Sequence, residues 1–345
     1  MRKLALILTV IFVLFAAGCN NEKAENRSPL SRTEFLMGTV VTIKVFDGNM
    51  EEAIDQSFEH LKMLAEQISV NDETESIIDQ INQEAGKKPV EVPEHIFTLI
   101  ETGKEYGAVS DGAFDITIGP LTNLWRIGFP DAKKPEDSEI EEVLPLIDYE
   151  QIDLDATKHT VFLKNAGMQI DLGAIAKGYM ADEVVNILQA NEVTSAIVDL
   201  GGNIFVLGKN TSGDDWSVGV QDPFSPRGEI IGKLHASNKS IVTSGIYERY
   251  LEVDGKTYHH LLNPKDGYPF DNEIAGVSVI TNQSIDGDAL STTLFAKGLD
   301  EGLRFAEELE DTEAIFITRD RKVYITSGLK DNFELVDEDY EFING

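Results

Sequence analysis

Residues 168–189 read MQIDLGAIAKGYMADEVVNILQ, and residues 194–208 read TSAIVDLGGNIFVLG. The first stretch changes from a short apolar run to apolar residues at helical spacing, which predicts a strand ending at Asp171 and then a helix. In the second stretch, β-branched runs flank Gly201 and Gly202, which predicts paired strands joined by a tight turn. This interleaving favours an α+β fold, with mixed β-sheets and packed helices, over a regular doubly wound sheet.

The flanking sequence supports the same fold class. Residues 33–46 are rich in β-branched side chains and predict one strand. Residues 50–69 and 93–110 carry apolar residues at helical spacing, and residues 133–145 form a charged segment around a short predicted helix. Beyond residue 151, short β-rich runs alternate with helical ones.

The N-terminus resembles a bacterial lipoprotein signal. Its apolar run is shorter than the roughly 20 residues that a bilayer span needs, so residues 1–18 predict a cleaved signal peptide. Small residues precede Cys19 as in a lipobox, although Ala16 stands where leucine is usual. We expect Cys19 to be lipidated, residues 19–32 to form a polar tether, and the protein to be anchored at the extracytoplasmic face of the cell membrane. The alternative is an ordinary secretory signal with an incidental cysteine.

Residues 33–330 are predicted to form one domain, and residues 331–345 an acidic C-terminal tail.

The composition of the chain disfavours several classes of partner and of catalytic chemistry. The formal charge of −32 disfavours nucleic acid as a partner, because nucleic-acid binding depends on Lys and Arg at phosphates. It equally disfavours a basic membrane-binding patch. With Cys19, the only cysteine, used for lipidation, disulfides within one chain, thiol catalysis and cysteine metal ligation are excluded.

Polar, glycine-rich patches interrupt the apolar pattern. In residues 110–125, SDGAFDITIGPLTNLW, Ser110 or Asp111 is suited to capping a helix, and Gly112 to a tight turn. In DLGAIAKG, a helix start with glycines and Lys177 is suited to an anion, although packing explains the glycines equally well.

Two further patches come later in the chain. Residues 242–250 and 258–269 read VTSGIYERY and YHHLLNPKDGYP. Within a strand, His259 and His260 would point to opposite faces, so one is expected to face a site. The stretch SIDGDALSTTLFAKG (residues 284–298) puts several oxygen-bearing side chains at the start of a helix.

In that helix, Asp288 and Thr292 lie four residues apart and therefore on one face. A carboxylate and a hydroxyl so placed can bind Mg²⁺, which prefers oxygen ligands and contacts substrate phosphates. Capping by the aspartate and packing by the threonine is the alternative.

Together these patches resemble the ApbE family, the FAD:protein FMN transferases. The resemblance covers about residues 33–330. The motifs that carry it occur in the family's order: FLMGT, SDGAFD, DLGAIAKG, DLGGNI, TSG, HLLNPKDG and DALSTTLF.

The resemblance implies FAD as substrate and Mg²⁺ as cofactor. A threonine hydroxyl of an acceptor protein would attack the FMN-side phosphorus of FAD, and AMP would leave. His260 would act as the base, while His259 would be dispensable. The implied FAD-binding residues are Met37, Asn71, Asp111, Gly112, Ala113, Asp171, Lys177, His260 and Leu261. The implied Mg²⁺ ligands are the carbonyl of Ala174 with Asp288 and Thr292.

Asn71 departs from the family pattern, because many members carry an aromatic residue there, which stacks on a ring system as asparagine cannot. This departure keeps an alternative enzyme open, an FAD pyrophosphatase that yields FMN and AMP. A non-catalytic flavin-binding lipoprotein is the third hypothesis; an Asp288–Thr292 pair beside a histidine argues against it.

Overall fold

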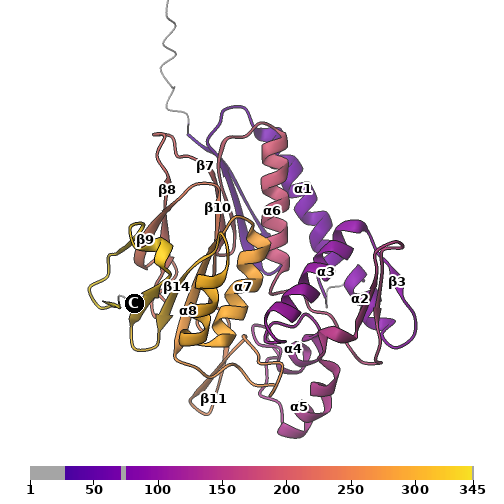
Figure 1. Cartoon of the computed structure of the whole chain (residues 1–345). Helices are drawn as coiled ribbons and strands as arrows, with labels where there is room; N and C mark the ends of the chain where they lie inside the picture. Colours follow the sequence, from indigo (N-terminus) through magenta and orange to yellow (C-terminus); the bar gives the residue numbers. More distant parts are fainter. Residues whose placement is uncertain (1–27, 71–74, 344–345) are drawn as a thin grey trace, which may run out of the picture.

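The computed structural model describes residues 28–70 and 75–343. Figure 1 shows helices lying against one side of a large sheet. The helices are α1 (Glu51–Ile68), α2 (Ile77–Gln83), α3 (Glu94–Val109), α4 (Gly119–Trp125), α5 (Asp137–Val143), α6 (Ala176–Ala190), α7 (Ser284–Lys297) and α8 (Leu299–Glu308), with 3-10 turns η1 (Leu144–Leu146), η2 (Tyr149–Gln151) and η3 (Ser327–Leu329).

The strands of the described residues form one large sheet and three small ones. In spatial order, the nine-stranded sheet contains β1 (Leu30–Leu36), β2 (Thr39–Val45), β6 (Ser195–Leu200), β7 (Asn203–Gly208), β10 (Lys239–Gly245), β13 (Ile274–Thr281), β14 (Glu313–Thr318), β15 (Lys322–Ile325) and β17 (Glu341–Phe342). The small sheets are β16 (Phe333–Leu335), β9 (Ile230–Ala236) and β8 (Trp216–Gln221); β3 (Val90–Glu91), β5 (Thr160–Leu163) and β4 (Ile152–Asp155); and β11 (Tyr250–Val253) with β12 (Lys256–His259).

The large sheet is covered on both faces. All residues of β13 are buried. Val279 packs in a core with side chains of α7 and α8, whereas Ile280 packs with side chains of β8 and β9. This alternation follows from the period of two in a strand. The pairs are antiparallel except β15–β17, so the sheet is mixed and the predicted α+β fold is confirmed.

Helix α7 lies in the middle of these layers. It packs on β10 and β13 and also contacts α6 and α8. Most of its residues are buried, including Ser284, Asp288, Ser291 and Thr293. Buried polar groups need hydrogen-bond partners, so each oxygen-bearing side chain at the start of α7 is expected to have one. No helix within residues 28–70 and 75–343 is long and apolar enough to cross a membrane.

Three sequence predictions of local structure were wrong. Residues 33–46 form a hairpin, β1 and β2, because Met37 and Gly38 turn the chain with φ of 47° and 70°. The strand predicted to end at Asp171 is only an isolated bridge between Ile118 and Gln169. The first strand starts at Leu30, within the predicted tether.

The predicted acidic tail is part of the fold. Strand β16 pairs with β9, and β17 pairs with β15. Between them Tyr340 is only 6% exposed and bonds the buried Asp222 through its hydroxyl. The acidic residues of this segment face solvent, and their charges obscured its alternating apolar residues.

Candidate active site

A cavity of about 210 Å³ lies between α6, α7 and the segment after β12. It is lined by Ala113, Phe114, Asp115, Ile116, Ile118, Thr122, Trp125, Ile127, Phe129, Asp171, Gly173, Ala174, Lys177, Thr243, Ser244, Glu248, Arg249, His260, Leu261, Leu262, Pro264, Asp288 and Thr292. These residues come from each of the polar patches in the sequence, so folding brings those patches to one place.

Most of the predicted site residues line this cavity. They are Ala113, Asp171, Ala174, Lys177, His260, Leu261, Asp288 and Thr292. Met37 is not among the lining residues; it sits at the β1–β2 turn. Asp111 and Gly112 also stand outside; they turn the chain after α3 with φ of 57° and 72°, so the predicted tight turn is present. Asn71 and Cys19 lie outside the described residues.

Only part of the oxygen-rich start of α7 faces the cavity. Asp286 accepts a hydrogen bond of 2.6 Å from the hydroxyl of Tyr106. Ser291 is paired with Ser244 at 2.8 Å, and the Thr293 hydroxyl donates to the carbonyl of Ala289 at 2.9 Å. Those oxygens therefore serve the packing of α7. Asp288 and Thr292 are the oxygen-bearing residues of this stretch that line the cavity.

Asp288 is held from α6. Its carboxylate is 4% exposed; Oδ2 accepts the Gly178 amide at 2.9 Å, and Oδ1 lies 3.9 Å from Nζ of Lys177. The amide of Ala176 is bonded to the carbonyl of Leu172. The amides of Ala176 and Gly178 are thus already paired, so the positive group that the start of α6 offers to an anion is the side chain of Lys177.

His260 faces the cavity as a neutral ring. Burial and the neighbouring charge of Arg249 lower the pKa of His260 to about 3. Its Nδ1 lies 3.3 Å from the carbonyl oxygen of Arg249. A carbonyl only accepts, so Nδ1 carries the hydrogen and Nε2 keeps its lone pair. This tautomer is suited to receiving a proton.

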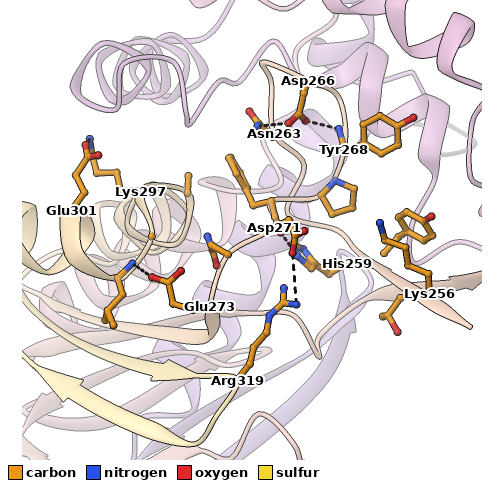
Figure 2. Close-up of a pocket in the computed structure, with 18 of the residues that line it drawn as sticks. Lys256, His259, Asn263, Asp266, Tyr268, Asp271, Glu273, Lys297, Glu301 and Arg319 are labelled. Atoms are coloured by element: carbon orange, nitrogen blue, oxygen red, sulfur yellow. Dashed lines mark hydrogen bonds and ion pairs between the residues drawn. The ribbon is translucent and has the colours of Figure 1, made fainter. Parts of the chain in front are cut away.

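His259 points to the other side of the same segment. Its Nε2 donates to the carbonyl of Phe270 at 2.9 Å, and its ring packs edge-on against Phe295. Figure 2 shows it in a second, open cavity with Arg319 and Asp271. That cavity is larger, about 1000 Å³, but Lys177, Asp288 and Thr292 do not line it. The smaller cavity is therefore the candidate active site.

Sequence reasoning missed several residues of the cavity, among them Arg249, Glu248 and Thr122. Arg249 and Glu248 line it, and burial raises the pKa of the Glu248 carboxyl while Lys177 and two arginines oppose that rise. Thr122 donates a 2.8 Å hydrogen bond to Oδ2 of Asp171 and so orients that carboxylate. The first two stand in the quoted stretch VTSGIYERY, four and five residues after Ser244.

The donor set fits Mg²⁺. The carbonyl of Ala174, the carboxylate of Asp288 and the hydroxyl of Thr292 are oxygen ligands, and the residues that carry them line one cavity. Among the described residues no group of three His, Cys, Asp or Glu side chains is close enough to hold a metal. A site with one carboxylate suits Mg²⁺, which takes its remaining ligands from water and substrate phosphates.

Comparison with known proteins identifies the family. The family model described as "ApbE family" matches residues 37–316, which include every residue that lines the cavity. The chain belongs to the ApbE family. The predicted family is thereby confirmed.

Curated relatives of this ApbE chain share one name. A protein of Klebsiella pneumoniae (strain 342), named FAD:protein FMN transferase, is 40% identical over 314 residues, covering 91% of this chain and 97% of the relative. A protein of Treponema pallidum (strain Nichols) with the same name is 34% identical over 346 residues, covering 95% of each.

Solved ApbE structures share the fold. The ApbE protein of Thermotoga maritima has a TM-score of 0.81 at 29% identity, covering 88% of this chain and 98% of that one. The flavinyl transferase ApbE of Pseudomonas stutzeri, in its apo form, has a TM-score of 0.77 at 27% identity, covering 88% and 96%. These names agree with the predicted class of enzyme.

Proposed function

We propose that this chain transfers FMN from FAD to a threonine hydroxyl of an acceptor protein, with Mg²⁺ as cofactor and AMP as the leaving group. The observation that carries the proposal is the meeting of Lys177, Asp288, Thr292 and His260 around one cavity. The names of the curated relatives support the transferase reaction.

Different residues of the chain would carry out different parts of a phosphoryl transfer. The acceptor oxygen forms a bond to the FMN-side phosphorus, and the bond from that phosphorus to the bridging oxygen breaks with its electron pair leaving on AMP. Nε2 of His260 receives the hydroxyl proton.

Charge neutralisation supplies much of such a reaction. Mg²⁺ held by Ala174, Asp288 and Thr292 would neutralise charge on the diphosphate. Lys177 supplies a second positive charge beside Asp288. The enclosed volume of about 210 Å³ is below the usual range for a drug-sized ligand, so FAD would extend beyond the cavity.

The cellular setting is also part of the proposal. Lipidation at Cys19 would hold the domain at the extracytoplasmic face of the membrane, next to membrane-bound acceptor proteins. Mass spectrometry of the N-terminal peptide from membranes tests this, because an unmodified or uncleaved Cys19 would contradict it.

The activity is tested with the chain from residue 20 onward, FAD, Mg²⁺ and an acceptor domain with a modifiable threonine. We expect an FMN-sized mass gain on the acceptor and equal AMP release, both abolished by a chelator. Asp288→Asn, which keeps the shape and one acceptor oxygen for Gly178, should lower AMP release by about 100-fold or more. AMP and free FMN without acceptor modification would instead establish an FAD pyrophosphatase. Bound FAD without AMP would establish a carrier.

A further inference from the structure

The N-terminus of α7 is capped by a residue of another helix. Gln283, the N-cap position itself, contributes no side-chain hydrogen bond. Instead, the carboxylate of Asp182 in α6 accepts the amide of Ser284 at 2.7 Å and that of Ile285 at 2.8 Å. A helix start has unsatisfied amides, so an oxygen acceptor placed there stabilises it.

A second hydrogen bond joins the same two helices, with its donor on α6 and its acceptor on α7. The amide of Gly178, in the first turn of α6, donates to Oδ2 of Asp288 in α7. On α6, Gly178 and Asp182 lie one turn apart, as do Ser284 and Asp288 on α7. Each helix therefore supplies an aspartate to amides at the start of the other, and one of these aspartates is the candidate metal ligand.

Among the described residues, the charged side chains that act most on Asp182 are acidic. They are Asp286 of α7 and Glu183 of α6. Asp286 is bonded by Tyr106 of α3, and Glu183 lies 3.0 Å from Nε2 of His60 of α1. The two α7 amides are thus the groups that hold the Asp182 carboxylate in place.

We propose that Asp182 is a positioning residue for the active site: it holds the start of α7 against α6, so that Asp288 and Thr292 stand opposite Ala174 and Lys177. It touches neither substrate nor metal and acts through α7. This inference rests on the proposed function, since it assigns the metal to Asp288 and Thr292. Without the cap, α7 can shift along α6, and ligands contributed by two elements lose their common geometry.

The test compares metal binding with stability. Asp182→Ala removes both acceptors, and Asp182→Asn keeps one amide oxygen. Ser76→Ala is the matched control: it removes the N-cap of α2, where the Ser76 hydroxyl accepts the Asp79 amide at 3.0 Å, and neither residue lines the cavity. Mn²⁺ binding is measured by electron paramagnetic resonance with FAD and no acceptor, FAD affinity by flavin fluorescence, and stability by urea unfolding.

We expect Asp182→Ala to weaken Mn²⁺ binding about fivefold or more while FAD affinity changes less than about threefold, because the typical loss of a cap corresponds to about a fivefold change. Asp182→Asn should fall between it and the wild type, and Ser76→Ala should lose stability without changing Mn²⁺ binding. Equal Mn²⁺ affinities in Asp182→Ala and Ser76→Ala would overturn the inference. If Asp182→Ala does not fold, Asp182→Asn decides, and wild-type affinity in that variant overturns it.

The two proposals fail in different ways. Wild-type protein that binds Mn²⁺ and FAD but neither releases AMP nor modifies an acceptor would overturn the proposed function. The comparison of Asp182→Ala with Ser76→Ala would still decide the role of the cap, because it is read from binding.

Discussion

The amide of Gly178 donates a 2.9 Å hydrogen bond to the carboxylate of Asp288, and this bond joins α6 to α7 at the candidate metal site. The close approach depends on the missing side chain at Gly178. A Cβ there would lie 2.3 Å from the carbonyl oxygen of Ser284 and 2.7 Å from Cα of Ile285. Both obstructing atoms belong to the backbone, so no rotamer change relieves the overlap.

Gly178→Ala is therefore expected to push α7 away from α6. Overpacking of this kind costs about 1–3 kcal/mol of unfolding free energy. Urea unfolding measures the loss, and Mn²⁺ binding should weaken in the same variant. Gln189→Ala on the exposed face of α6 is the control and should stay within about 0.5 kcal/mol of wild type. A Gly178→Ala protein as stable as this control would contradict the packing argument.

Removal of His260 and removal of its neighbour His259 should have different effects. His260→Ala removes the proposed base and should lower the rate of FMN transfer by about 10²–10⁴-fold. His259→Ala should leave the rate within about threefold, but it removes a ring that is 5% exposed and packed on Phe295, so it should destabilise the fold. Transfer kinetics together with thermal unfolding separate the two effects. Loss of activity in a folded His259→Ala protein would refute this division of roles.

Asp182 should make stability depend on pH. Burial, with smaller contributions from Asp286 and Glu183, raises the pKa of Asp182 from 3.8 to about 7. Between these values the folded protein retains a proton that the unfolded chain has lost. The free energy of unfolding therefore falls as the pH rises from 3.8 to about 7, and is unaffected by this group outside that window.

Asp182→Asn should remove this slope, as measured by urea unfolding at a series of pH values from 4 to 8 relative to the wild type. Parallel curves for wild type and Asp182→Asn would show that Asp182 titrates as it does in an unfolded chain.

The C-terminal segment should contribute to stability. Tyr340→Phe removes the hydroxyl that donates to Asp222 and leaves that carboxylate without one of its partners, at an expected cost of about 1.5–3 kcal/mol. Tyr250→Phe, at a tyrosine that is 57% exposed, should cost nothing measurable. Thermal unfolding of both variants checks this, and a flexible tail would make the two indistinguishable.

The sequence alone determined the elements whose signals are local. Apolar periodicity located α1 and α3, and the Gly201–Gly202 turn joins β6 to β7 as predicted. The ordered motifs identified the ApbE family, and the four-residue spacing of Asp288 and Thr292 put them on one face of α7. These patterns are readable because periodicity, turn chemistry and motif order involve residues close together in the chain.

Only the tertiary structure decided which of the oxygen-bearing residues share a site. Asp182 is 102 residues from Ser284, and no local pattern marks it as the cap of α7. Met37 and Asp111 belong to the recognised motifs but not to the cavity lining, while Arg249 lines the cavity and belongs to none of these motifs. Helix packing and strand pairing set these relationships, and both depend on contacts between segments far apart in the chain.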